Sequence, residues 1–228
     1  GNDLRIKNSD ASATYIQAAN GGAVELAHNN NIKIATTATG IDVTGISVSD
    51  GMSTNTLGTS NFIAGVNAGN SIVSGGNYNT VVGDEAGTDI TTGDSNTGVG
   101  YGSLNETTTG GSNTAIGVNS LEANTTGSNN TALGVQALDT NTTASNNTAV
   151  GYQSLYANTT GASNVALGAL ALDANTTGNQ NVGVGKNAIG TNTTGDANTA
   201  IGHGALAVAT TADNNTAVGF HSLVANTT

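Results

Sequence analysis

The chain has 228 residues, of which 33 are glycine, and it contains no proline, cysteine or tryptophan. Fifteen acidic residues against four basic ones give a formal net charge of -11. Binding to nucleic-acid phosphates requires clustered lysine and arginine, so we expect no nucleic-acid partner and no binding to anionic lipid. The lack of cysteine excludes disulfides and thiolate metal sites. No apolar run approaches the ~18 residues of a spanning helix, so we expect no membrane insertion.

The first part of the chain, residues 1–50, alternates apolar and polar residues in short segments. Such alternation is typical of half-buried strands. Residues 28–31, His-Asn-Asn-Asn, have the composition of a hairpin loop. We therefore predict a small antiparallel β region over residues 1–50, followed by a Ser/Thr/Asn/Gly-rich linker over 51–60. The predicted strands are Asp3–Lys7, Ala23–Ala27, Ile32–Ala35 and Thr39–Gly45.

From residue 61 to residue 228 the sequence is a tandem repeat built around one glycine, which we call the central glycine. A fixed period of this length indicates stacked repeats. We predict an all-β fold, a parallel β-solenoid (β-roll or β-helix) of ten 17–18-residue coils. Coils about 4.8 Å apart would form a rod of roughly 45–50 Å. The central glycine first occurs at Gly65, then 18 residues later at Gly83, and then at every seventeenth residue: Gly100, Gly117, Gly134, Gly151, Gly168, Gly185, Gly202 and Gly219.

Residues before the central glycine form four columns, which we name by their side chains. Asparagine stands four residues before it in every coil, and this first asparagine column is predicted to be a structural ladder. Threonine usually stands three before, and an aliphatic residue one before. Because Val165 and Val182 replace threonine, we predict that the threonine and aliphatic columns both face inward. The alanine or glycine between them, the small column, would then face outward and admit close approach of another backbone.

Residues after the central glycine form a second apolar row. Leucine, or Ile189, stands four residues on in eight coils from Leu104 to Leu223. Most copies then close with Asn-Thr-Thr-Gly or Asn-Thr-Thr-Ala, where glycine suits a left-handed turn. Each coil is therefore predicted to contain a strand, a tight corner, a second short strand and a turn. The Asn-Thr-Thr segments also match the N-glycosylation motif, but their turn chemistry explains them without sugar.

No motif in the sequence indicates catalysis or a cofactor. The segment Gly178–Lys186 resembles a phosphate loop but carries Gln180 where glycine is needed and Asn187 where serine or threonine is needed. His203 and His221 stand at positions that vary freely between coils, which favours exposed positions without a role. No paired carboxylates or Asp-rich calcium motif recur at a fixed spacing. We expect no enzyme activity, no cofactor and no metal.

Aromatic residues concentrate at the variable positions one, two and five residues after the central glycine. On a scaffold with so few aromatics, these side chains are candidate receptor contacts for a glycan or a protein. Relaxed variation at exposed positions is the alternative explanation. The candidates are Tyr101, Tyr152, Tyr156 and Phe220. The threonine ladders also raise the hypothesis of ice binding, but only one of two adjacent threonines can point outward.

Two stretches resemble known families. The run Gly22–Ala27 with Ala35–Gly45 resembles a segment of tail-fibre proteins of marine and cyanobacterial phages, and repeats such as Asn147–Gly161 are similar to repeats of the same fibres. The pentapeptide Asn-Thr-Ala-Val-Gly more distantly resembles the head repeat of trimeric autotransporter adhesins, although the period of 17 is longer. These resemblances imply a homotrimeric fibre. The Ala/Gly column offers an independent reason to expect a trimer, because it would let three coils pack closely about a common axis.

The sequence thus predicts a non-enzymatic structural protein, the shaft or distal region of a phage tail fibre, located in the virion and active in host attachment. Its expected partners are itself, as a homotrimer, and a host cell-surface glycan or protein. The alternatives are a bacterial surface adhesin or extracellular filament subunit, located at the cell surface, and an ice-binding solenoid. An abrupt start and a broken last repeat lead us to expect that the chain is a piece of a longer protein.

Overall fold

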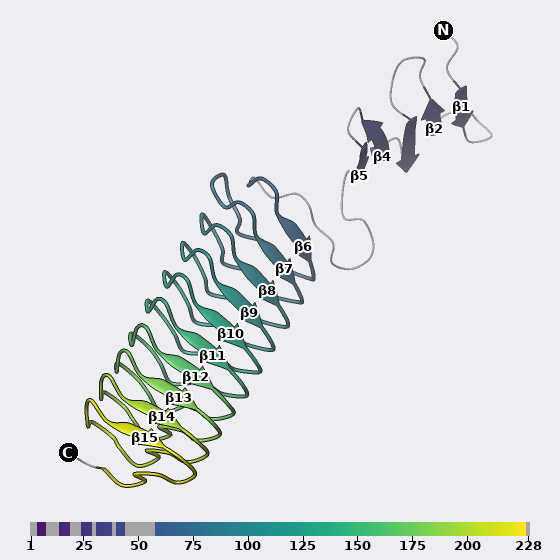
Figure 1. Ribbon diagram of the computed structural model, residues 1–228. Coiled ribbons are helices and arrows are strands. Elements are labelled where there is room, and N and C mark those ends of the chain that lie inside the picture. Colours follow the sequence, from purple (N-terminus) through teal and green to yellow (C-terminus); the bar gives the residue numbers. More distant parts are fainter. Residues whose placement is uncertain are drawn as a thin grey trace. The chain divides into compact units, whose positions relative to one another are not determined.

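The computed structural model describes residues 4–7, 14–18, 24–28, 31–37, 40–43 and 58–226. The chain divides into two compact units, Gly1–Met52 and Ser53–Thr228, and each is described by itself. Most of the predicted linker, as far as residue 57, and residues 29–30 of the predicted hairpin loop lie outside the described residues. The described residues contain strands and turns but no helix (Figure 1).

The first unit is a single antiparallel sheet with strand order β1-β2-β3-β4-β5. The alternating segments near residues 3–7, 23–27, 32–35 and 39–45 all contribute strands, so the prediction of an antiparallel β region is confirmed. One strand, β2, was missed because its sequence Thr-Tyr-Ile-Gln-Ala alternates only weakly. The strands are β1 (Leu4–Lys7), β2 (Thr14–Ala18), β3 (Val24–His28), β4 (Asn31–Thr37) and β5 (Gly40–Val43).

The second unit is the predicted β-solenoid, in which ten three-residue strands form one parallel sheet (Figure 1). Each strand pairs with the strand of the next coil in a fixed register, so that Thr131 lies beside Thr148 and Leu133 beside Val150. The prediction of a second strand in each coil is wrong, because residues 58–226 contain one strand per coil and the rest is turn. The strands are β6 (Phe62–Ala64), β7 (Thr80–Val82), β8 (Thr97–Val99), β9 (Thr114–Ile116), β10 (Thr131–Leu133), β11 (Thr148–Val150), β12 (Val165–Leu167), β13 (Val182–Val184), β14 (Thr199–Ile201) and β15 (Thr216–Val218).

The core contains the small column and the leucine column, so the predicted orientation of the strands is wrong. In each strand the middle residue is buried, as Ala132 and Ala149 are, whereas its two neighbours face outward. The space between the middle strand position and the leucine position holds one large side chain: Ile63 and Val81 in the first two coils face Gly69 and Gly87, whereas the later coils pair a small middle residue with leucine or isoleucine. At Gly98, for example, an added Cβ would lie 3.2 Å from Leu104 Cδ1, so the leucine already fills the space that faces the strand.

The central glycine is required by the stacking of the coils. Its φ lies between 125° and 146°, a region that other residues rarely adopt. A Cβ on Gly134 would lie 2.5 Å from the carbonyl oxygen of Gly151 in the next coil. The backbone of one coil therefore rests directly on that of the next.

Left-handed backbone occurs where the sequence did not predict it. The glycine of Asn-Thr-Thr-Gly does not have a positive φ; instead Leu121, Leu138 and Leu155 have φ of 51° to 52°. The same conformation recurs two residues before and, in most coils, eight residues after each of these leucines, as at Asn119 and Asn129. Full burial of the leucine side chain compensates for a conformation that is unfavourable in isolation.

The first asparagine column is a buried ladder, as predicted. The backbone N–H of Asn147 donates to Asn130 Oδ1 in the preceding coil at 2.9 Å. Its side-chain amide crosses its own coil and donates to the carbonyl of Gly161 at 2.9 Å. The asparagines of this column from Asn79 to Asn198 therefore tie two coils together and also close their own.

The asparagines of the Asn-Thr-Thr segments form a second buried ladder, the second asparagine column. The side-chain amide of Asn158 donates to Asn141 Oδ1 at 2.9 Å and to the Gly161 carbonyl at 2.9 Å, while its own Oδ1 accepts from Asn175 at 2.8 Å. These amides are fully buried in the folded coil, which leaves no room for an attached sugar there. The column contains Asn124, Asn141, Asn158, Asn175 and Asn192.

Candidate recognition surfaces

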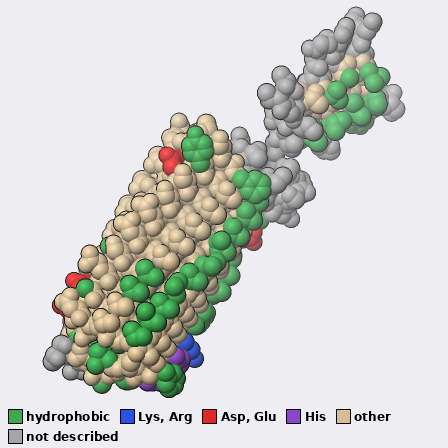
Figure 2. Space-filling model, in the orientation of Figure 1, with side chains coloured by type: hydrophobic (Ala, Val, Ile, Leu, Met, Phe, Trp, Pro, Cys, Tyr) green, Lys and Arg blue, Asp and Glu red, His purple; other side chains and the backbone are tan. Residues whose placement is uncertain are grey.

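An exposed row of aliphatic side chains runs along the parallel sheet, and we call it the aliphatic stripe. Its members stand one residue before the central glycine, at the end of each strand. Six of them are between 36% and 66% exposed, which is unusual for valine, leucine and isoleucine in a regular array. Figure 2 shows apolar side chains following the length of the solenoid. The stripe consists of Val82, Val99, Ile116, Leu133, Val150, Leu167, Val184, Ile201 and Val218.

The surface on the strand side of the stripe is uncharged, whereas Asp84 and Lys186 stand directly after a central glycine, on the other side. The outward residue at the start of each strand is threonine in seven coils, valine in two, and Phe62 in the first. The acidic residues of the described solenoid all lie outside its strands. A chain with a net charge of -11 therefore has a strand face on which another acidic chain could pack with little charge repulsion.

The threonine pairs after the second asparagine column expose only one side chain each, as predicted. The first threonine of a pair uses its hydroxyl within the solenoid: Thr125 Oγ1 donates to the Thr142 carbonyl at 3.1 Å. The second threonine, such as Thr126, is exposed. The Asn-Thr-Thr segments therefore contribute one exposed threonine column, and not the two outward threonines per coil that the ice-binding hypothesis requires of a flat array.

Three of the four predicted receptor contacts are well exposed. Tyr101 and Tyr152 are about half exposed and Phe220 is 76% exposed, and all three stand directly after a central glycine. Tyr156 is half-buried and lies in the same coil as Tyr152. Tyr101 and Tyr152 are three coils apart, or about 14 Å at the usual strand spacing. The structure therefore distributes these residues along the solenoid and does not gather them into one site.

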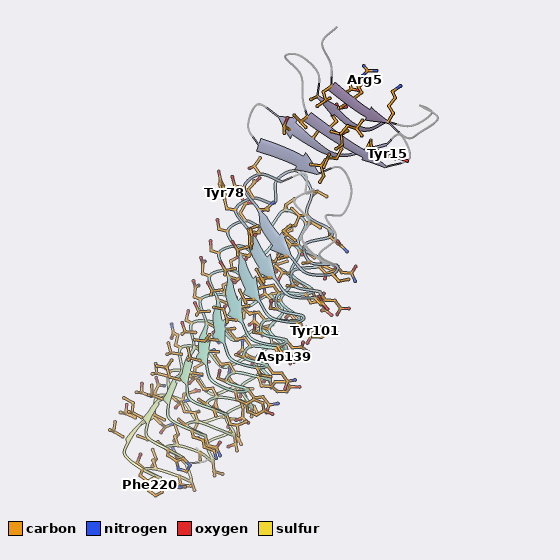
Figure 3. All side chains as sticks on the ribbon, turned by 90° about the vertical axis from the view of Figure 1, so that its right-hand side faces the viewer. Arg5, Tyr15, Tyr78, Tyr101, Asp139 and Phe220 are labelled. Atoms are coloured by element: carbon orange, nitrogen blue, oxygen red, sulfur yellow. The ribbon has the colours of Figure 1, made fainter. Side chains whose placement is uncertain are left out.

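Acidic side chains stand near the tyrosines. A hydrogen bond from Tyr101 to Glu85, together with the negative charge of that carboxylate, raises the pKa of Tyr101 above its usual value. Burial raises the pKa of Glu122, and the nearby Asp139 carboxylate adds to the effect. Burial likewise raises the pKa of Asp139, which accepts a hydrogen bond from Gln136 Nε2 at 3.1 Å. Figure 3 shows Tyr101 and Asp139 on one side of the solenoid and Tyr78 on the other.

Phe220 belongs to a small aromatic cluster near the last coils. Its ring stacks on His203 with a centroid distance of 5.4 Å and meets His221 edge-on at 4.3 Å. The two histidine rings are themselves 5.2 Å apart. The sequence placed both histidines at exposed positions, which is correct, but it did not indicate that stacking of adjacent coils joins them to Phe220.

Within the described ranges, no three His, Asp or Glu side chains come together in a way that could hold a metal ion. The described part of the chain also contains no helix long and apolar enough to cross a membrane. No family model, no curated protein and no solved structure matches this chain.

Proposed function

We propose that this protein is the structural shaft of a fibre, assembled from three parallel copies, that displays contact residues for attachment to a host cell surface. The observation that carries the proposal is the aliphatic stripe, which runs the length of a stacked, hydrogen-bonded solenoid and is left exposed in the single chain. A phage tail fibre, located in the virion, is the assembly that fits best with the resemblance of the repeats. The protein acts by mechanical display and not by catalysis.

The regular spacing of the aliphatic stripe favours parallel, in-register packing of three copies of the chain. Every coil presents its aliphatic side chain at the same place, so three chains related by a threefold axis would place equivalent residues at the same level. The stripe of one chain would then be covered by the stripes of the other two. The Ala/Gly column, which was expected to make this contact, is buried inside each coil and is not accessible to another chain.

The assembly is tested by placing charge on the stripe. The unmodified chain should sediment near three times 22.2 kDa. Combined Ile116→Glu and Leu133→Glu should shift the mass to that of one chain at micromolar concentration, because carboxylates would have to be buried next to one another. Both side chains are 39–44% exposed in the single chain, so its thermal unfolding should change little. Sedimentation velocity measures the masses.

The matched control for this test is the combined change Thr126→Glu and Thr143→Glu. It adds the same charge to the same neighbouring coils, at exposed positions outside the strands. The control should keep the mass of three chains. A single-chain mass for the unmodified protein, or equal masses for both double variants, would contradict the proposed assembly.

Attachment is tested on the coil that carries two tyrosines. Fluorescently labelled protein is applied to a panel of bacterial cells, and bound protein is measured by flow cytometry on the strains that it labels. Combined Tyr152→Ala and Tyr156→Ala should weaken binding at least tenfold, since aromatic contact residues contribute about 2 kcal/mol each. Tyr78→Ala removes an exposed tyrosine on the other side of the solenoid and should leave binding unchanged. Labelling of no strain, or equal binding by both variants, would refute the assigned contacts.

A further inference from the structure

The sheet of the first unit has two chemically different faces. Its register places Ile6 opposite Ile16, Ile16 opposite Leu26, and Leu26 opposite Ile34. Directly opposed residues project from the same face of a sheet, so four strands contribute to one continuous apolar row. A second row, Leu4, Ala18 and Val24, lies on the same face. We call this surface the apolar sheet face.

The other face of the same sheet carries polar side chains on three strands and Ala35 on β4. The register aligns Arg5 with Gln17 and Gln17 with Glu25, between the two apolar rows along the chain. Alternation of this kind, as in the strands β1 to β3, is typical of a sheet that buries one face and leaves the other in water. The alternation therefore favours burial of the apolar sheet face.

No layer covers the apolar sheet face within the described part of this unit, which consists of the one sheet. Leu4 is 63% exposed, Ile6 49% and Leu26 39%. A sheet gains stability by packing an apolar face against another element, and one layer alone supplies no core. The face is thus complementary to a second apolar surface.

We propose that the apolar sheet face packs against the same face of other copies of this chain. The inference rests on the proposed fibre assembly and adds a second contact to it. Four strands of about five residues cover roughly 300 Å², whereas a stable interface needs about 800 Å² from each partner. An unlinked partner would bind so small a face only transiently. A copy already joined through the solenoid is present at an effective concentration in the millimolar range, which makes the small contact sufficient.

The experiment uses the absence of cysteine from the chain, because a single introduced cysteine can be crosslinked only to another copy. Leu26→Cys places a thiol on the apolar sheet face, and Gln17→Cys places one on the polar face of the neighbouring strand. A short bismaleimide that spans about 10 Å, the usual distance between packed sheets, is added to the full chain. Crosslinked chains are measured on a denaturing gel, and thiol exposure is measured with a fluorescent maleimide.

Leu26→Cys should give at least tenfold more crosslinked chain than Gln17→Cys and should be labelled at least tenfold more slowly. Ile6→Cys, on the same row, should behave as Leu26→Cys does. Fast labelling of Leu26→Cys would overturn the inference. Slow labelling without crosslinking would also overturn it, since the face would then be covered by something other than its equivalent.

Leu133→Cys on the aliphatic stripe separates this inference from the proposed assembly. Crosslinking of Leu133→Cys without crosslinking of Leu26→Cys would leave the fibre assembly standing and refute only the sheet contact. The reverse pattern would support the sheet contact and refute the role of the stripe. Failure of both variants to crosslink would refute both.

Discussion

Replacement of Gly134 by alanine should lower the free energy of unfolding by about 3–5 kcal/mol. The φ of 140° at this position contributes strain of roughly 1–3 kcal/mol for a residue with a Cβ. The new methyl group would also lie 2.5 Å from the Gly151 carbonyl oxygen and 2.7 Å from its carbon, an overlap that only a shift of the next coil can relieve. Such a shift would strain the neighbouring hydrogen bond from Gly151 N–H to the Leu133 carbonyl, 2.8 Å long.

Gly190→Ala is the matched control for this substitution. Its φ is outside the left-handed region, and the nearest atom to an added Cβ, the Asn187 carbonyl oxygen, is 3.4 Å away. The free energy of unfolding should therefore change by less than about 1 kcal/mol. Alanine also lowers the conformational entropy of the unfolded chain, which slightly favours the folded state. Denaturant unfolding followed by circular dichroism measures both. If the two variants unfold at the same denaturant concentration, backbone contact between coils does not limit this position.

Asn158→Asp should destabilise the solenoid by about 3 kcal/mol at neutral pH. Among the substitutions considered, only Gly134→Ala is expected to have a larger effect on stability. The substitution replaces an amide that donates to Asn141 Oδ1 and to the Gly161 carbonyl by an oxygen that repels both. The carboxylate would be fully buried with one remaining donor, the Asn175 amide. Loss of a partner for a buried polar group costs roughly 1–3 kcal/mol, and more when the group is charged.

The destabilisation by Asn158→Asp should decrease in acid. Burial among acceptors raises the folded-state pKa of the new carboxyl above its unfolded value near 4. The folded protein then holds the proton more tightly than the unfolded chain does. The variant therefore loses stability relative to the unmodified protein as pH rises from the unfolded pKa through the folded pKa.

Asn129→Asp makes the same chemical change at an exposed position that tolerates left-handed backbone. It should cost less than about 0.5 kcal/mol and show little pH dependence relative to the unmodified chain. Thermal unfolding of the three proteins from pH 3.5 to pH 7 distinguishes these cases. A pH-independent difference between Asn158→Asp and the unmodified chain would mean that the site is hydrated.

The period was sufficient to predict the stacked coils, because each residue type returns at the same place and parallel pairing aligns it with itself. Residue types alone did not predict which side of the strand faces inward. Threonine and valine at Val165 and Val182 exchange as readily on an outer apolar face as on an inner one. The orientation depends on the width of the coil, which the leucine column determines, and on the left-handed backbone of residues such as Leu138. Leucine rarely adopts that backbone, so composition gives no indication of it.

The sequence predicted the exposed aromatic residues but not the aliphatic stripe. Tyr101, Tyr152 and Phe220 stand at variable positions, and such variation correctly indicated exposure. The aliphatic stripe was missed because a regular row of valine, leucine and isoleucine normally indicates a core. In a solenoid of narrow coils, the same regularity can mark a surface that another chain covers.

The uniform register also determines the length of the solenoid. Each coil receives the same backbone hydrogen bonds from its predecessor, so insertion or deletion of 17 residues leaves every other rung unchanged. The length of the solenoid therefore changes in steps of about 4.8 Å, one step for each 17-residue repeat that is gained or lost. Recombination between repeats would therefore lengthen or shorten the solenoid, and each added coil would pack by the same contacts as the existing coils.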